Sequence, residues 1–327
     1  MGSSKQAKAL ARALGGSVTI KNIVYNPFIH LPNIIKPYRI GVNFKESSNL
    51  LSGQEAPDII IFGGRRLAGI GIFLRKHFES KFNKKVWLIA ILDPNYDFKS
   101  FDFVILPLHD KINFRRNRDN VVYINGSLCD PRISVADSVR DYWNKKLENA
   151  RTPFFSLMIG GNVRQRKMDP LKLGSMVRKV SAYVAKKKGT LLVSSSRRTG
   201  AACLEETRKS LDCDHYIYEW AENSCVPNPY YLFVEKSSAV FITGDSISMV
   251  SEVATMGRPT YILYVPEEFA GLKQERFCKS LEEAGLAKKI SPNSGPIEEF
   301  QDNRSLNELE RLSELIKNNI LGHAAAL

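Results

Sequence analysis

The chain has 327 residues, of which 43% are hydrophobic and 25% are charged, a composition typical of globular proteins. This length exceeds that of one typical domain. Its formal net charge of +13 favours anionic partners such as phosphorylated ligands, nucleic acid or acidic lipid surfaces, but no DNA- or RNA-binding motif is present. Five scattered cysteines without a C-x-x-C pair and five histidines without ligand spacing argue against a metal site, so we expect no metal and a cytoplasmic location. No signal peptide or apolar run of ~18 residues is present; we expect no transmembrane segment, while peripheral membrane contact stays open.

The first half of the chain alternates predicted strands and helices. A helix over residues 3–14 comes first, with alanine and leucine on one face and a Gly-Gly stop at its end. The strands that follow are almost continuously apolar, which is typical of a parallel sheet covered on both faces. We expect these strands at 58–62, 86–92, 103–106 and 121–124, with a helix at 67–78 after the first strand.

A polar helix at 134–149 links this series to a second one, which begins with a strand at 154–159. Two strand series predict two domains, 1–150 and 151–327, each Rossmann-like with a parallel sheet. The last helix is expected to pack back on the first domain. In the second series we expect strands at 190–193, 215–220, 239–242 and 260–265, a long helix after the first strand, and helices at 247–256 and 306–320.

Nearly every predicted strand ends in a polar or glycine-rich loop. In open α/β sheets, ligands bind outside the carboxyl ends of the strands. Two such domains facing each other would form a deep cleft lined by these loops. The loops read Gly-Gly-Arg-Arg, Asp-Pro-Asn, His-Asp, Gly-Gly-Asn, Ser-Ser-Arg-Arg-Thr and Gly-Asp-Ser.

The most informative stretch is residues 243–252, Thr-Gly-Asp-Ser-Ile-Ser-Met-Val-Ser-Glu, which lies between two apolar strands. It predicts a strand, a turn and a helix, with Asp245, Ser246 and Ser248 around the helix N-terminus. Unpaired N–H groups and the positive end of the helix dipole favour a phosphate there. Glu252 could accept a ribose diol from the same helix. The alternative is that Asp245 or Ser246 only caps the helix and Glu252 is an exposed carboxylate.

The other loops of the second domain also suit a diphosphate. Adjacent glycines allow close approach of the backbone, hydroxyls donate hydrogen bonds, and guanidinium groups match phosphate oxygens. The alternatives are a plain turn at the glycines and a solvated helix start at the arginines. The candidates are Gly160, Gly161, Ser195, Ser196, Arg197, Arg198 and Thr199.

The first domain offers fewer candidates. Gly64 and Arg65 follow its first strand, where the arginine could contact an acidic group, and Asp93 follows the second strand. His109 and Asp110 follow the third strand. They are the candidate catalytic residues, because histidine is the usual general base near neutral pH. The alternative is that this pair is structural, with mutual hydrogen bonds or a cap on the next turn.

These motifs together resemble the mitochondrial fission family of the plant elongated-mitochondria protein and its bacterial relatives. The resemblance covers essentially the whole chain, and its most specific block is residues 243–252. The other matching motifs are Ile159-Gly160-Gly161, Ser194-Ser195-Ser196-Arg197-Arg198-Thr199, Asn228-Pro229-Tyr230, Gly63-Gly64-Arg65, Asp93-Pro94, Pro107-Leu108-His109-Asp110 and Gly2-Ser3-Ser4-Lys5-Gln6.

The sequence departs from the family pattern in two places. The family has a strand before the G-x-x-x-Q loop, whereas this sequence starts at the loop. The first strand of the N-terminal sheet is therefore expected to be absent, leaving the 58–62 strand with a free edge. The stretch before Asn228 is glycine-rich with an acidic residue in the family, but here it is 224–227, Ser-Cys-Val-Pro. The resemblance still implies Asn228 as a ligand-binding candidate, although the turn that precedes it differs from the family pattern.

The resemblance implies a GT-B-like layout of two Rossmann-like domains facing a central cleft. Glycosyltransferases of this layout bind a nucleotide-sugar in the C-terminal domain. The implied ligand is a nucleotide-sugar or another phosphorylated small molecule, with no cofactor. The leading hypothesis is a glycosyltransferase-like protein in which catalysis is an open question. The alternative is a non-enzymatic adaptor or scaffold with the same fold, as in the mitochondrial fission relatives.

Overall fold

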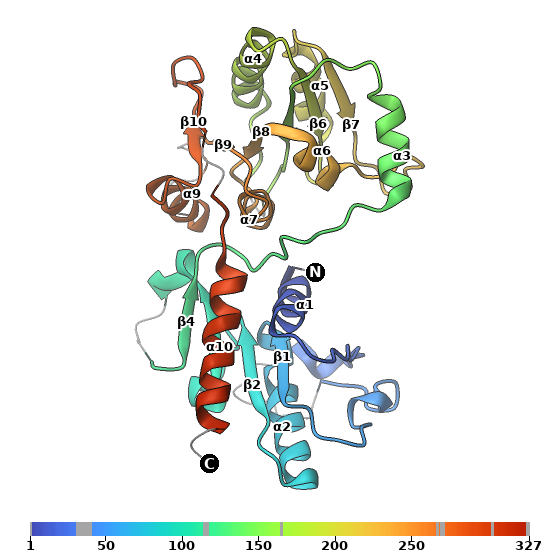
Figure 1. Cartoon of the computed structure of the whole chain (residues 1–327), viewed down its shortest axis with the longest axis vertical. Coiled ribbons are helices and arrows are strands. Elements are labelled where there is room, and N and C mark those ends of the chain that lie inside the picture. Colours follow the sequence, from blue (N-terminus) through green and yellow to red (C-terminus); the bar gives the residue numbers. More distant parts are fainter. Residues whose placement is uncertain are drawn as a thin grey trace. The chain divides into compact units, whose positions relative to one another are not determined.

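The structure, a computed structural model, describes residues 2–30, 41–113, 118–163, 166–265, 268, 272–301 and 304–324. The chain forms two compact units (Figure 1). Unit 1 comprises Met1–Ile124 and Glu308–Leu327, and unit 2 comprises Asn125–Asn307. Each unit is built around a parallel sheet with helices, which confirms the expected α/β fold class.

The sheet of unit 1 has four described strands in the order β1-β2-β3-β4, and all neighbours are parallel. β1 pairs only with β2 among the described residues, so it lies at an edge of the sheet, as expected. The strands are β1 (Ile59–Gly63), β2 (Trp87–Ile91), β3 (Phe103–Pro107) and β4 (Val121–Ile124). The helices are α1 (Gly2–Leu14), α2 (Ala68–Phe82) and α10 (Glu308–Ala324), with short 3-10 helices at Pro27–His30, Ser48–Leu50, Arg65–Leu67, Phe98–Ser100 and Leu108–Asn113.

The first and last helices pack against each other in unit 1. Leu10 of α1 and Ile316 of α10 are fully buried, because each helix carries its apolar residues on one face. Two polar contacts hold the last helix in place. Lys317 donates to the Ala13 carbonyl at 3.0 Å, and Arg311 donates to the Tyr123 carbonyl at 2.8 Å.

Unit 2 contains a six-stranded parallel sheet in the order β10-β9-β8-β5-β6-β7. Its strands are β5 (Phe154–Met158), β6 (Thr190–Ser194), β7 (His215–Tyr218), β8 (Ser237–Thr243), β9 (Thr260–Leu263) and β10 (Lys288–Ile290). Its helices are α3 (Asp137–Lys146), α4 (Pro170–Lys186), α5 (Ala201–Lys209), α6 (Tyr230–Lys236), α7 (Ile247–Thr255) and α9 (Lys273–Glu283).

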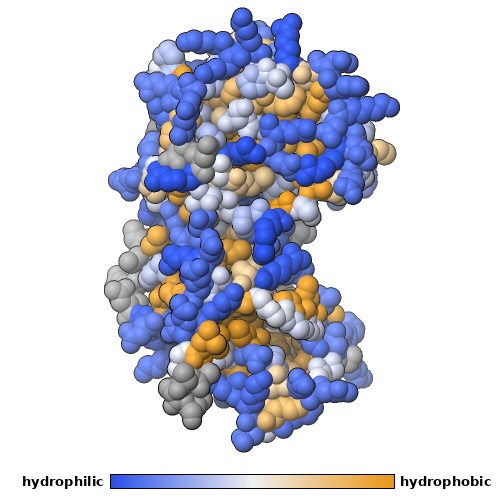
Figure 2. All heavy atoms as spheres, viewed as in Figure 1, coloured by the Kyte–Doolittle hydropathy of each residue, from blue (hydrophilic) through white to orange (hydrophobic). Residues whose placement is uncertain are grey.

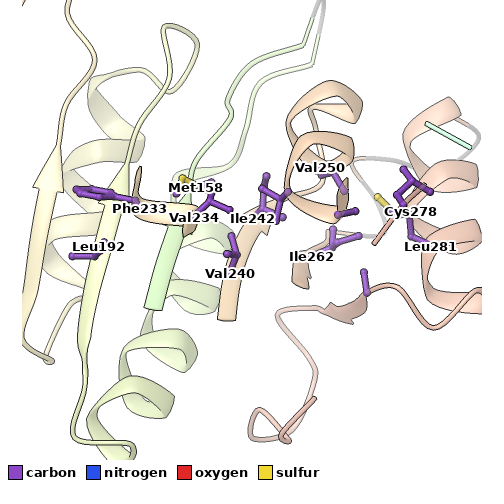
Figure 3. Packing of buried hydrophobic residues seen from close by; sticks show 14 of the residues in the cluster. Met158, Leu192, Phe233, Val234, Val240, Ile242, Val250, Ile262, Cys278 and Leu281 are labelled. Atoms are coloured by element: carbon purple, nitrogen blue, oxygen red, sulfur yellow. The ribbon is translucent and has the colours of Figure 1, made fainter. Parts of the chain in front are cut away.

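Alternate residues of the unit 2 strands point to opposite faces of the sheet, and each face has its own core. Phe241 of β8 lies in the core covered by α4 and α5. Val240 and Ile242 lie in the other core, which α3, α6, α7 and α9 cover. Figure 3 shows this second core, where Phe233 of α6, Val250 of α7 and side chains of α9 pack over the strands.

Residues 125–150, which the sequence pattern places in the first domain, pack with unit 2. Trp143 of α3 is fully buried and donates from its indole nitrogen to the Pro227 carbonyl at 2.8 Å. Its ring meets Phe233 edge to face, with centroids 4.8 Å apart. Unit 2 therefore begins directly after β4, at Asn125.

The chain passes between the units twice, and on the unit 2 side both passages are attached to α7. The Ser127 amide donates to the Ser251 hydroxyl at 3.1 Å on the outgoing passage. The Leu306 amide donates to the Ala254 carbonyl at 3.0 Å on the returning passage. At the first contact a Cβ on Gly126 would lie 2.4 Å from the Ser251 hydroxyl, so only glycine fits there.

Replacing Trp143 should strongly destabilise unit 2. Trp143→Ala removes a fully buried side chain, and we expect a loss of about 3–5 kcal/mol in the free energy of unfolding. The matched control is Tyr142→Ala, which removes an exposed neighbour and should cost about 1 kcal/mol or less. Urea unfolding followed by circular dichroism measures both. Equal losses in the two variants would contradict the assignment of α3 to the core of unit 2.

Candidate functional site

The order of the strands places a ligand-binding crevice at the ends of β5 and β8. From β5 the chain continues to β6 and β7 on one side, then returns to β8 on the other side of β5. The helices after these two strands, α4 and α7, cover opposite faces of the sheet. In open α/β sheets such a switch point leaves a crevice at the carboxyl ends of the strands. The predicted loops Gly160-Gly161, 195–199 and 244–246 all follow β5, β6 or β8 at this edge.

Asp245 joins two of these loops. Its side chain is only 3% exposed, and it accepts hydrogen bonds from three groups. The Thr243 hydroxyl donates at 2.6 Å, the Gly161 amide at 3.1 Å, and a guanidinium nitrogen of Arg198 at 3.0 Å. The Gly160 amide donates in turn to the Thr243 hydroxyl oxygen at 2.7 Å. The carboxylate therefore faces β5 and β6, away from the first turn of α7.

The two glycines are required by this packing. A Cβ on Gly160 would lie 2.2 Å from a carboxylate oxygen of Asp245. A Cβ on Gly161, whose φ is +147°, would lie 2.0 Å from the Arg198 carbonyl oxygen. Both amides already donate within the protein, so the structure explains the glycines by the joining of loops. Their contact with a ligand remains a prediction.

Burial raises the pKa of Asp245 above its ordinary value of 3.8. The Thr243 hydrogen bond, the positive charge of Arg198 and the Gly161 amide each lower this pKa and only partly offset the burial. The ionised carboxylate is therefore less favourable in the folded protein than in the unfolded chain. The three donors, one of them the cationic Arg198, offset part of the cost of burying this charge.

The hydroxyls after β6 are also used inside the protein. Ser195 accepts from the Trp220 amide at 2.9 Å, which joins this loop to the end of β7. Thr199 donates to the Gly160 carbonyl at 2.7 Å, and Ser196 donates to the same carbonyl. These three residues, which were predicted to bind a ligand, instead make hydrogen bonds that connect the loops of the site to one another. Arg197 is different, because its side chain is exposed to solvent.

The N-terminus of α7 is not capped by a side chain. Ser246 occupies the N-cap position without a side-chain cap hydrogen bond, and Asp245 points elsewhere. The first backbone hydrogen bond of the helix runs from the Val250 amide to the Ser246 carbonyl at 3.0 Å, so the amides ahead of Val250 precede the helical ladder. Ser248 is exposed at the same end. The capping alternative is therefore not what the structure shows.

Two tyrosines of α6 lie close to Glu252. Glu252 sits half-buried on α7, and its charge acts on the hydroxyls of Tyr230 and Tyr231 on α6, while the Tyr230 hydroxyl donates to the Met249 carbonyl of α7 at 3.3 Å. Burial and the negative charge of Glu252 both raise the pKa of each tyrosine, which keeps the phenols protonated as donors. The sequence motif at 228–230 pointed to Tyr230, but no signal pointed to Tyr231. Asn228 is exposed and accepts from the Tyr230 amide at 3.0 Å, which sets the turn into α6.

The candidates of unit 1 follow the carboxyl ends of its strands. Gly64 (φ +84°) turns the chain into an exposed Arg65, and Asp93 accepts from the Asn95 amide at 2.8 Å. His109 is 5% exposed in the 3-10 helix after β3, with Asp110 half-buried next to it. A catalytic role for His109 and Asp110, and ligand contacts from the other three residues, stay predictions.

Comparison with known proteins identifies the family. The family model described as "Mitochondrial fission ELM1" matches residues 1–320. The chain belongs to this family. A relative, the uncharacterised protein RP120 of Rickettsia prowazekii (strain Madrid E), is 27% identical over 348 residues, covering 97% of this chain and 95% of RP120. The mitochondrial fission protein ELM1 of Arabidopsis thaliana is 25% identical over 260 residues. That match covers 73% of this chain but only 58% of the plant protein.

Solved structures with similar architecture include enzymes that act on sugar nucleotides. The UDP-GlcNAc 2-epimerase of Methanocaldococcus jannaschii has a TM-score of 0.49 and 11% identity, covering 84% of this chain and 78% of the epimerase. UGT89C1 of Arabidopsis thaliana complexed with UDP has a TM-score of 0.39 and 10% identity, covering 82% of this chain and 65% of UGT89C1. Similarity at this level does not bear on ligand or activity. Within the described residues, no helix is both long and apolar enough to cross a membrane.

The stability of unit 2 should depend on the protonation of Asp245. Because its folded pKa is raised, Asp245 contributes stability below pH 3.8 that is lost as pH rises through the folded pKa. The free energy of unfolding of wild type minus that of Asp245→Asn should therefore fall as pH rises from 3.8 toward neutrality. Urea unfolding at a series of pH values measures this difference.

In the control for this experiment, the stability difference should change with pH in the opposite direction. Arg140 holds the pKa of Glu235 below its ordinary value of 4.5, so the corresponding difference for Glu235→Gln should rise with pH. A pH-independent difference for Asp245→Asn, or one that rises as for Glu235→Gln, would contradict the assignment of Asp245 as a carboxylate disfavoured by burial.

Gly160→Ala should destabilise the protein, since the new methyl group must displace Asp245. We expect a loss of about 1–3 kcal/mol, measured by thermal unfolding. The matched control is Gly295→Ala in the same unit, where a Cβ meets nothing within 4 Å and the change should stay within about 0.5 kcal/mol. If both alanines are tolerated alike, the loops are not packed as tightly as this structure has them.

Proposed function

We propose that unit 2 binds a nucleoside diphosphate, the common part of nucleotide-sugars, at the carboxyl ends of β5, β6 and β8. The observation that carries the proposal is the uncapped N-terminus of α7 after β8, at the same end of the sheet as the loop after β6 that carries the exposed Arg197. Amide N–H groups at a helix N-terminus and a guanidinium group are both suited to phosphate oxygens. Ser246 and Ser248 add two hydroxyl donors at the same place.

Asp245 supports this role, although it is itself an acid. A free carboxylate at the helix N-terminus would repel a phosphate. Here the carboxylate points away from α7 and its charge is compensated by Arg198 and two further donors. It thereby holds Gly161, Arg198 and the start of α7 in one rigid group, and rigid donors lose little entropy when they bind an anion.

Glu252 is suited to the ribose. Its carboxylate lies near the hydroxyls of Tyr230 and Tyr231, and a carboxylate has about four acceptor sites, which is enough to accept from both hydroxyls of a diol. It lies on α7 about one and a half turns from Ser246, which at about 1.5 Å per residue is near the span from a diphosphate to its ribose.

The second candidate function is a non-enzymatic adaptor that keeps the fold, by analogy with the plant family member whose printed name describes a fission protein. The burial of His109 favours this candidate, because a general base must come within hydrogen-bonding distance of the proton it removes. Nucleotide binding is compatible with both candidates, so glycosyl transfer has to be tested separately.

Titration calorimetry with a UDP-sugar, UDP and uridine tests the binding site. Ser246→Asp should weaken UDP by at least about tenfold and more than Ser246→Ala, since the aspartate places a negative charge where the helix N-terminus awaits an anion. Arg197→Ala should weaken UDP by about 5- to 30-fold and leave uridine unchanged. Glu252→Ala should weaken uridine as well as UDP, because a ribose contact does not need the phosphate.

The matched control is Ser238→Asp, an exposed serine at the opposite end of β8, which should leave binding unchanged. Absence of heat and of a thermal shift with every nucleotide in the wild-type protein would sink the donor-site proposal and leave the adaptor. Binding without sugar-nucleotide turnover would support the adaptor that retains a ligand.

A further inference from the structure

One short segment of unit 1 exposes an unusual number of apolar side chains. Among the described residues, nine large hydrophobic side chains are strongly exposed, and five of them lie between residues 18 and 28. Ile20 is 51% exposed and Phe28 is 59% exposed. Exposed apolar residues are normally scattered, and a concentration of them marks an interaction site. The five are Val18, Ile20, Val24, Tyr25 and Phe28, and we call residues 17–28 the apolar segment.

The apolar segment is attached to the body of unit 1. The Val24 amide donates to the Ser47 hydroxyl at 3.0 Å, and the Asn43 amide donates to the Val24 carbonyl at 2.9 Å. Lys21 donates to the Asn49 carbonyl. The backbone is thus held while the apolar side chains stay outside. The segment is therefore anchored to unit 1 at Lys21 and Val24.

Basic residues accompany the apolar segment. α1, which leads into it, contains no acidic residue, and Lys8 and Arg12 are exposed on its outer face. The charge of Arg66, an exposed residue after β1, acts on the Tyr25 hydroxyl. Figure 2 shows hydrophobic and strongly hydrophilic side chains next to one another on the face of unit 1 that it presents.

The positive charge of the chain is concentrated in the unit that carries this segment. Unit 1 has 21 Lys and Arg against 12 Asp and Glu, whereas unit 2 has 26 against 22. Unit 1 therefore holds +9 of the net charge of +13, although it is the smaller unit. The two features that strengthen binding to an anionic lipid surface, exposed apolar side chains and basic charge, occur together.

We propose that the apolar segment and α1 bind an anionic lipid bilayer surface. The apolar and aromatic side chains enter the interfacial region, and Lys8 and Arg12 contact the acidic headgroups. Residues 17–24 have no helix or strand, and polar residues lie between the exposed Val18, Ile20 and Val24. A fluid lipid interface accommodates separate insertions of such side chains, and its acidic headgroups complement the basic charge of unit 1. Tyrosine is moreover among the residues enriched at membrane interfaces.

Vesicle sedimentation with the full-length protein tests the proposal. Wild type should sediment with phosphatidylcholine vesicles that contain about 30% phosphatidylglycerol and not with phosphatidylcholine alone, and salt should weaken binding. Val18→Ser with Ile20→Ser should weaken binding by about tenfold or more. Lys8→Gln with Arg12→Gln should weaken it by about 30-fold at low salt. All four side chains are exposed, so folding should be retained, which circular dichroism checks.

Matched controls come from unit 2. Leu171→Ser removes a side chain that is 70% exposed, and Lys186→Gln with Lys188→Gln removes two exposed charges, and neither change should alter sedimentation. Unchanged sedimentation of the Val18 and Ile20 variant would overturn the proposal, as would equal binding to neutral vesicles. A wild-type dimer that becomes monomeric in that variant, seen by analytical ultracentrifugation, would also overturn it and identify a second copy as the occupant.

Discussion

A buried, hydrogen-bonded carboxylate determines how the ends of the central strands in unit 2 are arranged. Asp245 faces the loop after β5 through Gly161 and the loop after β6 through Arg198. A buried charge is tolerated only when it is paired and hydrogen-bonded, so each loop must hold the position that supplies its donor. The same requirement excludes a side chain at residue 160 and leaves the start of α7 uncapped. One ionisable group thus accounts for Gly160, for the ion pair of Arg198 and for the open helix end.

Most strands and long helices were predictable because their signal is local, whereas the short β10 and the helix α5 after β6 were not predicted. Apolar runs such as 154–159 and 190–193 are recognisable as buried parallel strands, and the polar loops mark their ends. α6 escaped because it has only seven residues and follows a Pro-Asn-Pro turn, too short for a helical period to be visible. The helix α9 was not predicted either, although its sequence carries a helical pattern. Its buried residues recur at helical spacing, namely Gln274, Phe277, Cys278 and Leu281.

The chemistry of the site was less predictable than its location. The motif at 243–252 correctly pointed to the strand end and the helix after it, but it did not show which polar atoms serve the protein itself. The Gly160 amide and the Thr243 hydroxyl are 83 residues apart in the chain, and their hydrogen bond depends on β5 and β8 being neighbours. The spacing of residues in the sequence does not show which strands will be neighbours in the sheet. Ser195, Ser196 and Thr199 therefore resembled ligand donors, whereas the structure gives their hydroxyls internal partners.

The attachment of both interunit passages to α7 has a thermodynamic consequence. The outgoing passage is fixed at Ser251 and the returning passage at Ala254, one helical turn apart. A ligand that orders the first turn of this helix would restrict both tethers at the same time. The loss of conformational entropy would then be shared between the binding site and the connections, although no residue of unit 1 need touch the ligand. Ligand affinity and the freedom of the two connections would be reciprocally linked through a helix of nine residues.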